Sequence, residues 1–381
     1  MKNTRTEEKY DTENEQGYET AEEPQKKKGS AKKYLLSGAF LIALMAVTFY
    51  VIFKDTSIQD IWSLLKDVRL PFVFAGILSM LAYITVQGLI IGLAAKCIHV
   101  KLKLTEMLQY SFIGFFYSGI TPSSTGGQPM QVYHMCRDRL SPSRTTLVMF
   151  ITNIAYQLSV VLIGLISFSF KMKYIAGIHG GIIAVFFIGL SINLFILFIL
   201  AGVLFSENTL KKALGGIVVF LCRIKIIKKP DKALRSIEKY LEEFEEGVKL
   251  IRANRKRFIL TLLATLMQFL FYHLIPYFVY RAFGFSEYTF TDFIAIGAVL
   301  YVAVSMFPLP GAVGAAESGF VLLFGPLFGK TIMPAMLLSR FITFYTMMLV
   351  SGVISAYAQL RRPYNLSKSH SPNNDKKEPV S

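Results

Sequence analysis

The stretch Thr121-Pro-Ser-Ser-Thr-Gly-Gly-Gln-Pro129 decides how the first half of the chain folds, because it interrupts the otherwise apolar segment 105–131. Pro122 prevents an uninterrupted helix, since it lacks an N–H donor and its ring clashes with the preceding turn. The Ser, Thr and Gly residues that follow favour a turn. A new helix is expected to start there, capped by Thr125 or a neighbour, with Pro129 near its first turn. The segment is therefore predicted to form two half-helices joined by a turn.

A second stretch, Ser305-Met-Phe-Pro-Leu-Pro-Gly-Ala-Val-Gly-Ala-Ala-Glu317, divides the apolar segment 290–328 in the same way. Its two prolines interrupt the helix, and Gly311 and Gly314 loosen the backbone before a second short helix begins. The order proline, glycine and then a polar side chain recurs in both stretches. This recurrence indicates an internal duplication.

Long apolar runs account for most of the remaining chain. Of the 381 residues, 53% are hydrophobic and only 17% are charged, which is not the composition of an ordinary soluble domain. A helix of about 20 apolar residues crosses the ~30 Å of hydrocarbon in a bilayer. The runs of this length are 35–53, 70–95, 145–170, 180–205, 258–283 and 333–359. The predicted fold class is an all-α polytopic integral membrane protein, with about six full transmembrane helices and two re-entrant broken-helix segments.

The positive charges indicate the orientation. Five lysines at positions 26, 27, 28, 32 and 33 lie just before the first run, and the linker 206–257 and the residues after 360 are also rich in Lys and Arg. All three regions are therefore expected in the cytoplasm. Lys171 and Lys173 fall on the opposite side and are a minor exception. The alternation holds only if each broken segment enters and leaves on the same side. We therefore expect a multi-pass protein of the cell (cytoplasmic) membrane with both termini cytoplasmic.

The chain divides into two membrane halves and three polar regions. The expected divisions are a disordered cytoplasmic tail (1–34), a first membrane half (35–205) with re-entrant segment 105–131, a cytoplasmic amphipathic linker (206–257), a second membrane half (258–360) with re-entrant segment 290–328, and a cytoplasmic tail (361–381). The two halves point in opposite directions, because span 258–283 lies three crossings after span 70–95. Inverted pairs of broken helices are typical of transporters, whose site lies at the midplane.

The linker carries an apolar stripe at helical spacing. Its members are Leu234, Ile237, Leu241, Phe244, Val248 and Ile251. A helix with one such stripe packs on the membrane surface or on the bundle, or it docks a partner as a coiled coil.

One charged residue lies within the last span. Arg340 would cost ~2.5–3.5 kcal/mol there unless it is paired or hydrated, and Glu317 is its most plausible partner by position. The pair either holds the guanidinium ready for a lipid phosphate or only fixes the bundle. Half-helix N-termini also suit phosphate. The candidate substrate-binding residues are Ser123, Ser124, Thr125, Gly126, Gly127, Gln128, Gly311, Gly314, Glu317 and Arg340. Glu106, at the entry to the first broken segment, is a candidate gating residue or a solvated interfacial carboxylate.

Motifs for catalysis and cofactors are missing from the sequence. It has no Walker loop, no HExxH and no G-x-S-x-G, so no catalytic residue is assigned. The three cysteines, Cys97, Cys136 and Cys222, match no zinc or redox spacing. We expect no metal and no cofactor. The basic excess of +16 comes without a nucleic-acid motif, so nucleic acid is not an expected partner either.

Residues 122–129 and 308–317, together with Arg340, resemble the flippase-like membrane domain of lysylphosphatidylglycerol synthases. The resemblance covers roughly residues 35–360. It implies a membrane domain that moves aminoacylated phosphatidylglycerol to the outer leaflet. In that family a separate soluble domain makes the lipid from lysyl-tRNA and phosphatidylglycerol, which raises resistance to cationic peptides. Because the chain ends at Ser381, the expectation is lipid handling without that transferase domain. Ala312 stands where the family often has a second glycine.

Three functions follow as expectations. The first is a lipid translocase for an anionic or aminoacylated phospholipid such as lysyl-phosphatidylglycerol. The second is a phosphatidylglycerol lysyltransferase or a membrane subunit of one. The third is a membrane scaffold that recruits a synthase through helix 231–257. The expected partners are a phospholipid, the membrane and a separate lipid aminoacyltransferase, and a homo-oligomer is left open.

Overall fold

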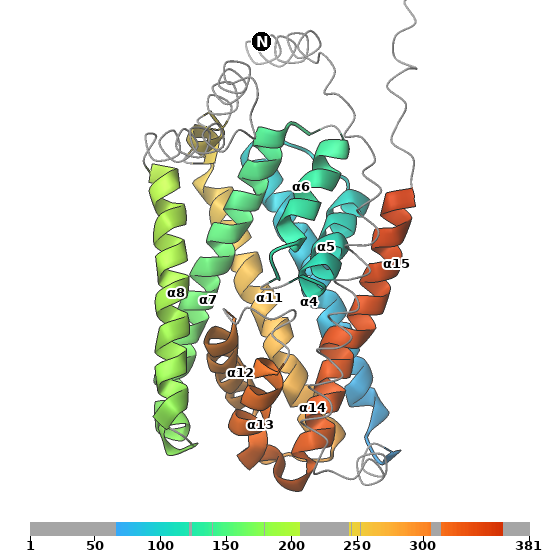
Figure 1. Cartoon of the computed structure of the whole chain (residues 1–381), viewed down its shortest axis with the longest axis vertical. Helices are drawn as coiled ribbons and strands as arrows, with labels where there is room; N and C mark the ends of the chain where they lie inside the picture. The colour runs from blue at the N-terminus through green and yellow to red at the C-terminus, as the bar shows by residue number, and fades with distance from the viewer. Residues whose placement is uncertain are drawn as a thin grey trace, which may run out of the picture. The chain divides into compact units, whose positions relative to one another are not determined.

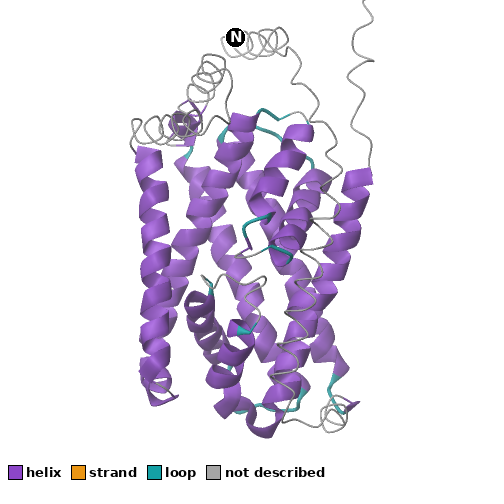
Figure 2. Ribbon diagram, viewed as in Figure 1, coloured by secondary structure: helices purple, strands orange, loops and turns teal. Residues whose placement is uncertain are grey.

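The computed structural model describes residues 66–121, 124–138, 140–178, 180–205, 244, 246–251, 253–305 and 314–360. All of them fall within one compact unit, Ala43–Ser381. Every regular element in these ranges is a helix, and none is a strand (Figure 2). The predicted all-α polytopic fold is therefore confirmed. The first predicted span, 35–53, and the two tails lie outside the described residues.

The helices follow the predicted segments closely. Those of the first half are α4 (Leu70–Cys97), α5 (Leu104–Gly119), α6 (Gly127–Arg137), α7 (Pro142–Ile178) and α8 (Gly180–Phe205). Those of the second half are α11 (Arg255–Ala282), α12 (Phe290–Val304), α13 (Ala315–Phe328), the 3-10 turn η4 (Gly329–Thr331), α14 (Ile332–Arg340), the π-helix η5 (Phe341–Tyr345) and α15 (Thr346–Leu360).

Five helical segments in the described part of the chain are long and apolar enough to cross a membrane. They are Leu70–Cys97, Pro142–Gly177, Gly181–Gly202, Arg255–Ala282 and Ala315–Leu360. The last segment reverses direction at its η4 turn, where Gly329 has a φ of +53°, so the part that crosses runs from α14 to α15 (Figure 1). The protein is therefore a multi-pass membrane protein.

Helices α5, α6, α12 and α13 are each too short to cross a membrane. The lengths of α5, α6, α12 and α13 are 16, 11, 15 and 14 residues. At 1.5 Å per residue they extend about 17 to 24 Å, less than the ~30 Å of a hydrocarbon core. In Figure 1, α5 and α6 run from one end of the bundle to its middle and back, and α12 and α13 do the same from the opposite end. We call these pairs the first hairpin and the second hairpin.

The two ends of the bundle can be named by residues that lie at them. The end from which the first hairpin enters holds Cys97 and Arg137, and we call it the Cys97 end. The opposite end holds the ion pair between Lys171 and Asp292, and we call it the Lys171 end. The helices α4 and α11, which precede the two hairpins, pack along each other and run in opposite directions (Figure 1). This is the inverted arrangement that the sequence predicts.

Polar side chains join the two inverted halves. Gln268 on α11 donates to the Gln87 side chain on α4 at 2.8 Å, and Ser79 donates to the Phe271 carbonyl at 2.7 Å. On the other flank, the Asn193 amide donates to the Ser305 hydroxyl at 3.2 Å. Amides in spans often form such interhelical bonds. Gln87, Gln268 and Asn193 therefore hold neighbouring helices together.

Acidic residues cap the first turns of three hairpin helices. Glu106 accepts the Lys103 N–H at 2.8 Å at the start of α5, and Asp292 accepts the Thr289 N–H at 2.8 Å at the start of α12. Glu317 accepts the Gly314 N–H at 2.6 Å at the start of α13. A carboxylate at this position satisfies a free N–H and complements the helix dipole. Glu106 and Asp292 thus mark where the two hairpins begin, and Glu317 marks where the returning helix of the second hairpin begins.

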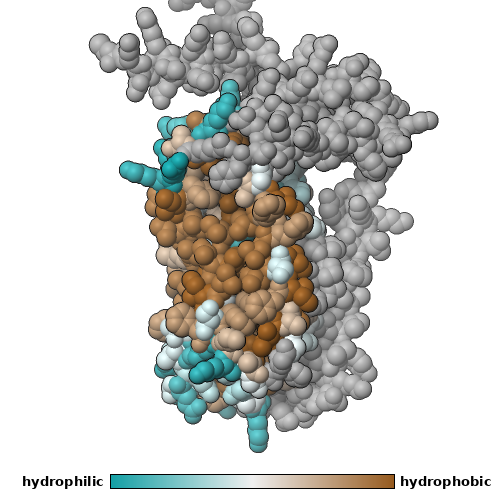
Figure 3. All heavy atoms as spheres, turned by 90° about the vertical axis from the view of Figure 1, so that its left-hand side faces the viewer, coloured by the Kyte–Doolittle hydropathy of each residue, from teal (hydrophilic) through white to brown (hydrophobic). Residues whose placement is uncertain are grey.

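The surface shows where the hydrocarbon lies. Figure 3 shows a broad apolar band across the middle of one face, with hydrophilic side chains at the two ends. Several large apolar side chains of α8 are exposed, including Phe187, Phe195 and Phe198. Exposed apolar residues on this scale fit a helix that faces lipid.

The end of the linker stripe packs on the bundle. Phe244, Val248 and Ile251 are buried in a cluster at the Cys97 end, with Cys97 of α4 and Val148 of α7. This confirms packing on the bundle for the described part of the stripe. Its other three members lie outside the described ranges.

Candidate functional site

A cavity of about 440 Å³ lies between the tips of the two hairpins. We call it the central chamber. Ser124, Gly127 and Gln128 from the first hairpin and Ser305 and Ala316 from the second line it. Side chains of α4, α7, α11 and the segment around Arg340 complete the wall. Its volume is that of a small-molecule site, and its position is where the inverted broken helices of transporters place their substrate.

The turn of the first hairpin is closed by neutral groups. The Thr121 hydroxyl donates to the Tyr117 carbonyl at 2.6 Å and accepts the Gly126 N–H at 2.8 Å. Helix α6 then starts at Gly127, with Gly126 as its cap. The predicted new helix is therefore present, but its N-cap, Gly126, makes no side-chain capping hydrogen bond. The Gly126 N–H is occupied by the threonine, so it is not free for an anion.

Close packing of α5 on α6 positions this turn. A Cβ atom at Gly127 would lie 2.6 Å from the Gly114 carbonyl oxygen and 2.1 Å from the Ser118 hydroxyl. The two helices touch backbone to backbone at this point. Gln128 and Asn153 bond each other twice, at 2.8 and 3.0 Å, and so tie α6 to α7 beside the chamber.

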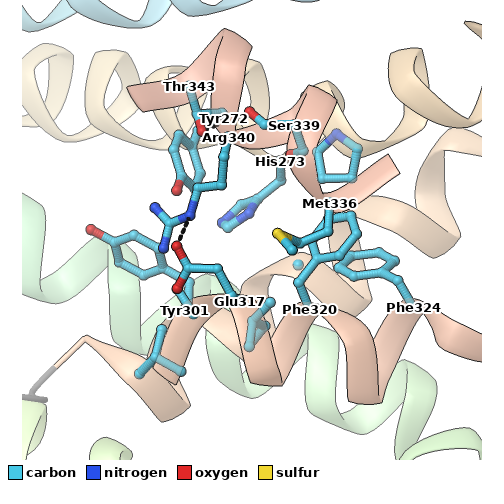
Figure 4. Close-up of a pocket in the computed structure, with 15 residues that line it drawn as sticks. Tyr272, His273, Tyr301, Glu317, Phe320, Phe324, Met336, Ser339, Arg340 and Thr343 are labelled. Atoms are coloured by element: carbon cyan, nitrogen blue, oxygen red, sulfur yellow. Dashed lines mark hydrogen bonds and ion pairs between the residues drawn. The ribbon is translucent and has the colours of Figure 1, made fainter. Parts of the chain in front are cut away.

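The second hairpin brings a charged pair to the chamber. The Arg340 Nε atom lies 2.7 Å from Glu317 Oε1, and Glu317 is 5% exposed (Figure 4). Glu317 Oε2 is the atom that accepts the Gly314 N–H, so both carboxylate oxygens are engaged. Gly314 itself has a φ of +88°, a left-handed conformation that favours glycine. The Glu317–Arg340 pair predicted from sequence is confirmed.

The pair leaves part of the guanidinium free. Arg340 Nη2 is buried and has no hydrogen-bond partner among the described residues. Phe344 lies beside the group, with its ring centre 5.9 Å from the Arg340 Cζ atom. Arg340 is also the one charged side chain among the described residues that line the central chamber. A buried donor without an acceptor is costly, so this nitrogen is suited to an anionic ligand.

A smaller pocket of about 80 Å³ adjoins the chamber on the second hairpin. Glu317 and Arg340 lie at its border, and His273, Phe320 and Met336 are among its other walls (Figure 4). Most of this lining is apolar. The ion pair therefore stands between a polar chamber and a small apolar pocket.

The structure brings part of the predicted site together. Ser124, Gly127, Gln128 and Arg340 line the central chamber, and Glu317 lines the smaller pocket. The other predicted residues are placed as follows: Thr125 and Gly126 lie in the first turn, Gly314 caps α13, and Ser123 and Gly311 fall outside the described residues. Glu106 caps α5 and is not among the residues that line the chamber.

Sequence reasoning missed four tyrosines. Tyr83, Tyr156, Tyr272 and Tyr301 all line the central chamber, and the hydroxyls of Tyr156 and Tyr301 hydrogen-bond each other. Tyrosine in a membrane helix usually lies at the interface with water. Tyr83, Tyr156 and Tyr272 instead lie well inside long helices, and Tyr301 lies in the last turn of α12, at the tip of the second hairpin. That position is the signal that could have pointed to a polar interior.

Comparison with known proteins agrees with this architecture. Residues 35–351 match the family model described as "Lysylphosphatidylglycerol synthase TM region". The chain is also 23% identical over 330 residues to a UPF0104 membrane protein of Archaeoglobus fulgidus, which covers 85% of this chain and 97% of that protein. The matched region includes both hairpins and Arg340. The chain therefore belongs to the lysylphosphatidylglycerol synthase transmembrane-region family.

Proposed function

We propose that the protein is a lipid translocase of the flippase type, which moves an anionic or aminoacylated phospholipid between leaflets. Lysyl-phosphatidylglycerol is one candidate. The observation that carries the proposal is the buried, unpartnered Nη2 of Arg340 on the wall of the central chamber. An arginine edge matches the geometry of a phosphate group.

The position of Glu317 supports this role for Arg340. The carboxylate holds Nε, so the guanidinium plane is fixed while its Nη2 edge stays available. A purely structural pair would be expected to satisfy all of its buried donors. Pre-orientation by Glu317 also reduces the entropy lost when a ligand binds.

The hairpins support the translocation step. Each reaches the chamber from a different end of the bundle, so opposite ends can open in turn while the site stays in place. We place the protein in the cytoplasmic membrane, with the Cys97 end and both termini on the cytoplasmic side. We also propose that a separate lipid aminoacyltransferase supplies any aminoacylated substrate.

The test is transbilayer movement of a phosphatidylglycerol labelled on its acyl chain, measured in proteoliposomes by loss of outer-leaflet label. Wild-type protein should move the lipid, and Arg340→Ala should reduce the rate at least tenfold, because the phosphate loses a charge-assisted bond of roughly 1.5–3 kcal/mol. Equal rates for the two proteins would overturn the proposal.

A matched control removes a cation from another ion pair. Lys171→Ala breaks the pair with Asp292 at the Lys171 end, outside the central chamber. Its transport rate should stay within twofold of wild type. A loss equal to that of Arg340→Ala would mean that rate reports general damage to the bundle, and the proposal would then fail.

A further inference from the structure

The Glu317–Arg340 pair is electrically neutral before any ligand binds. Arg340 is positive, and Glu317, whose Oε1 atom lies 2.7 Å from Arg340 Nε, is negative. Among the described residues, Arg340 is the one charged side chain in the lining of the central chamber. A lipid phosphate bound at Arg340 Nη2 therefore leaves this region with one negative charge in excess. Because a charge without a partner is costly inside the bundle, the loaded site needs one more positive charge.

A proton can supply that charge, and few groups near the pair can accept one. The titratable groups around Glu317 in the described part of the chain are Tyr272 and His273 of α11, Tyr301 of α12, Arg340 of α14 and Tyr345 of η5. Arginine is already protonated, and the tyrosine hydroxyls are neutral groups that have a proton to lose. The phosphate of a phospholipid is a stronger acid than a carboxyl group, so it does not take the proton. Glu317 and His273 remain.

Glu317 is the better acceptor of the two, because it shares the guanidinium with the incoming phosphate. The carboxylate contacts Arg340 at Nε, and the phosphate would contact the same side chain at Nη2. Two anions that share one site do not both stay ionised at low cost, so the weaker acid binds a proton. A proton on His273 would instead add a second cation to the small pocket that Arg340 already borders, which like-charge repulsion disfavours.

Protonation leaves the hydrogen bonds of Glu317 in place. Its Oε2 atom accepts the Gly314 N–H at 2.6 Å, and its Oε1 atom faces Arg340 Nε. A protonated carboxyl group keeps acceptor capacity on its oxygens. Glu317 can therefore lose its charge and still cap α13 and hold the guanidinium.

Water in the central chamber can deliver the proton. The chamber has a volume of about 440 Å³ and is lined by amides and hydroxyls, so it is polar and large enough to hold water. Tyr272, Tyr301 and Arg340 line both the chamber and the smaller pocket that Glu317 borders. The carboxyl group is therefore separated from the chamber only by side chains that the two cavities share.

We propose that Glu317 binds one proton each time a lipid phosphate binds Arg340, so that the protein is a proton-coupled translocase. The proton adds to a carboxylate oxygen from water on the side where the lipid enters, and it returns to water on the side where the lipid leaves. The empty pair and the loaded site are both neutral, so no net charge crosses with a lipid that carries one negative charge. This inference rests on the proposed function and adds the coupling ion and its site.

The experiment measures how far phosphatidylglycerol with a labelled acyl chain accumulates in the inner leaflet of proteoliposomes, with Arg340→Ala as background. With the outside about one pH unit more acidic and the potential held at zero, the inner-to-outer ratio of the label should rise about tenfold, because one-to-one coupling passes the proton gradient on to the lipid. A potential of about 100 mV without a pH gradient should leave the ratio unchanged. Uncoupled movement of the lipid anion would instead respond to that potential about 50-fold and ignore the pH gradient.

Glu317→Gln tests the site, because glutamine keeps the shape of the side chain and takes up no proton. This variant should still move the lipid, and its ratio should stay near one under the pH gradient. His273→Gln is the matched control, since it removes the other proton acceptor of the same pocket, and it should keep the tenfold response. If Glu317→Gln does not fold, wild type and His273→Gln still decide, because a response that His273→Gln loses would overturn the assignment to Glu317.

The outcomes separate the coupling from the proposed function. Movement that depends on Arg340 but ignores the pH gradient would overturn the proton coupling and leave the translocase intact. A tenfold response that survives in Glu317→Gln would overturn the site. If wild type moves no more lipid than Arg340→Ala under either gradient, the proposed function fails and the coupling fails with it.

Discussion

The two hairpins share a backbone path and differ in chemistry. In the first hairpin, the turn is closed by the Thr121 hydroxyl and braced by the neutral Gln128–Asn153 pair. In the second, the corresponding place is held by the charged Glu317–Arg340 pair. A duplicated fold therefore supplies two similar walls, of which one shapes the chamber and the other supplies its charge. Binding energy for an anion should be concentrated on the second hairpin.

The largest expected effect on stability comes from breaking the charged pair of the second hairpin. Glu317→Ala removes the cap of α13 and leaves Arg340 buried without its partner. We expect a loss of about 3–5 kcal/mol in the free energy of unfolding, the usual cost of breaking a buried pair. Thermal unfolding in detergent measures it. Glu317→Gln, which keeps the shape and can still accept the Gly314 N–H, should lose less, and equal losses would contradict the role of the charge.

In the first hairpin, substitutions are expected to lower the free energy of unfolding through packing rather than through charge. Gly127→Ala places a Cβ atom 2.6 Å from the Gly114 carbonyl oxygen, a backbone atom that cannot move without separating α5 from α6. Overpacking of this kind costs about 1–3 kcal/mol, again measured by thermal unfolding. The control is Gly177→Ala on α7, where a Cβ atom meets nothing within 4 Å. If Gly127→Ala and Gly177→Ala lower the stability equally, the close approach of α5 and α6 does not constrain the residue at position 127.

A glycine of the second hairpin should matter for a different reason. A Cβ atom at Gly314 meets nothing within 4 Å, but the residue has a φ of +88°. Gly314→Ala should therefore cost about 1–2 kcal/mol through backbone strain alone. Gly325→Ala, in the same helix and also without close neighbours, is the matched control. A stability for Gly314→Ala equal to that of the control would show that the turn relaxes freely.

The smallest expected effect concerns the amide pair. Gln128→Leu removes both bonds to Asn153, and interhelical bonds of this kind average about 0.6 kcal/mol. A double-mutant cycle with Asn153→Leu isolates this coupling from other losses. A Gln128–Asn153 coupling energy as large as the stability lost in Glu317→Ala would contradict the proposed difference between the two hairpins.

Much of the fold could be predicted from single-residue chemistry. Long apolar runs predicted the spans, and Pro122 together with the glycines that follow it predicted the first broken helix. The Glu317–Arg340 pair followed from the cost of a lone charge in a span, which leaves few possible partners. These predictions succeed because proline, glycine and buried charge each impose a strong local constraint.

The wall of the central chamber could not be predicted in this way. The long helices are apolar on all sides, so their sequences carry no periodic pattern that says which face meets which neighbour. Tyr83 and Tyr272 come together only because α4 packs along α11. Contacts between residues so far apart in the chain depend on helix rotation, which no local motif reveals.

The π-helix Phe341–Tyr345, which directly follows Arg340, accommodates one extra residue within the last membrane helix. A π-turn holds one residue more than an α-turn. Five residues wound as a π-turn rotate the chain about as far as four residues of α-helix, so removing one residue there would restore the α-form and leave Ile332–Arg340 nearly in phase with Thr346–Leu360. A relative one residue shorter across this turn would therefore still present the arginine to the chamber. Alignments of the family need to allow a one-residue gap at this turn so that the arginines are matched.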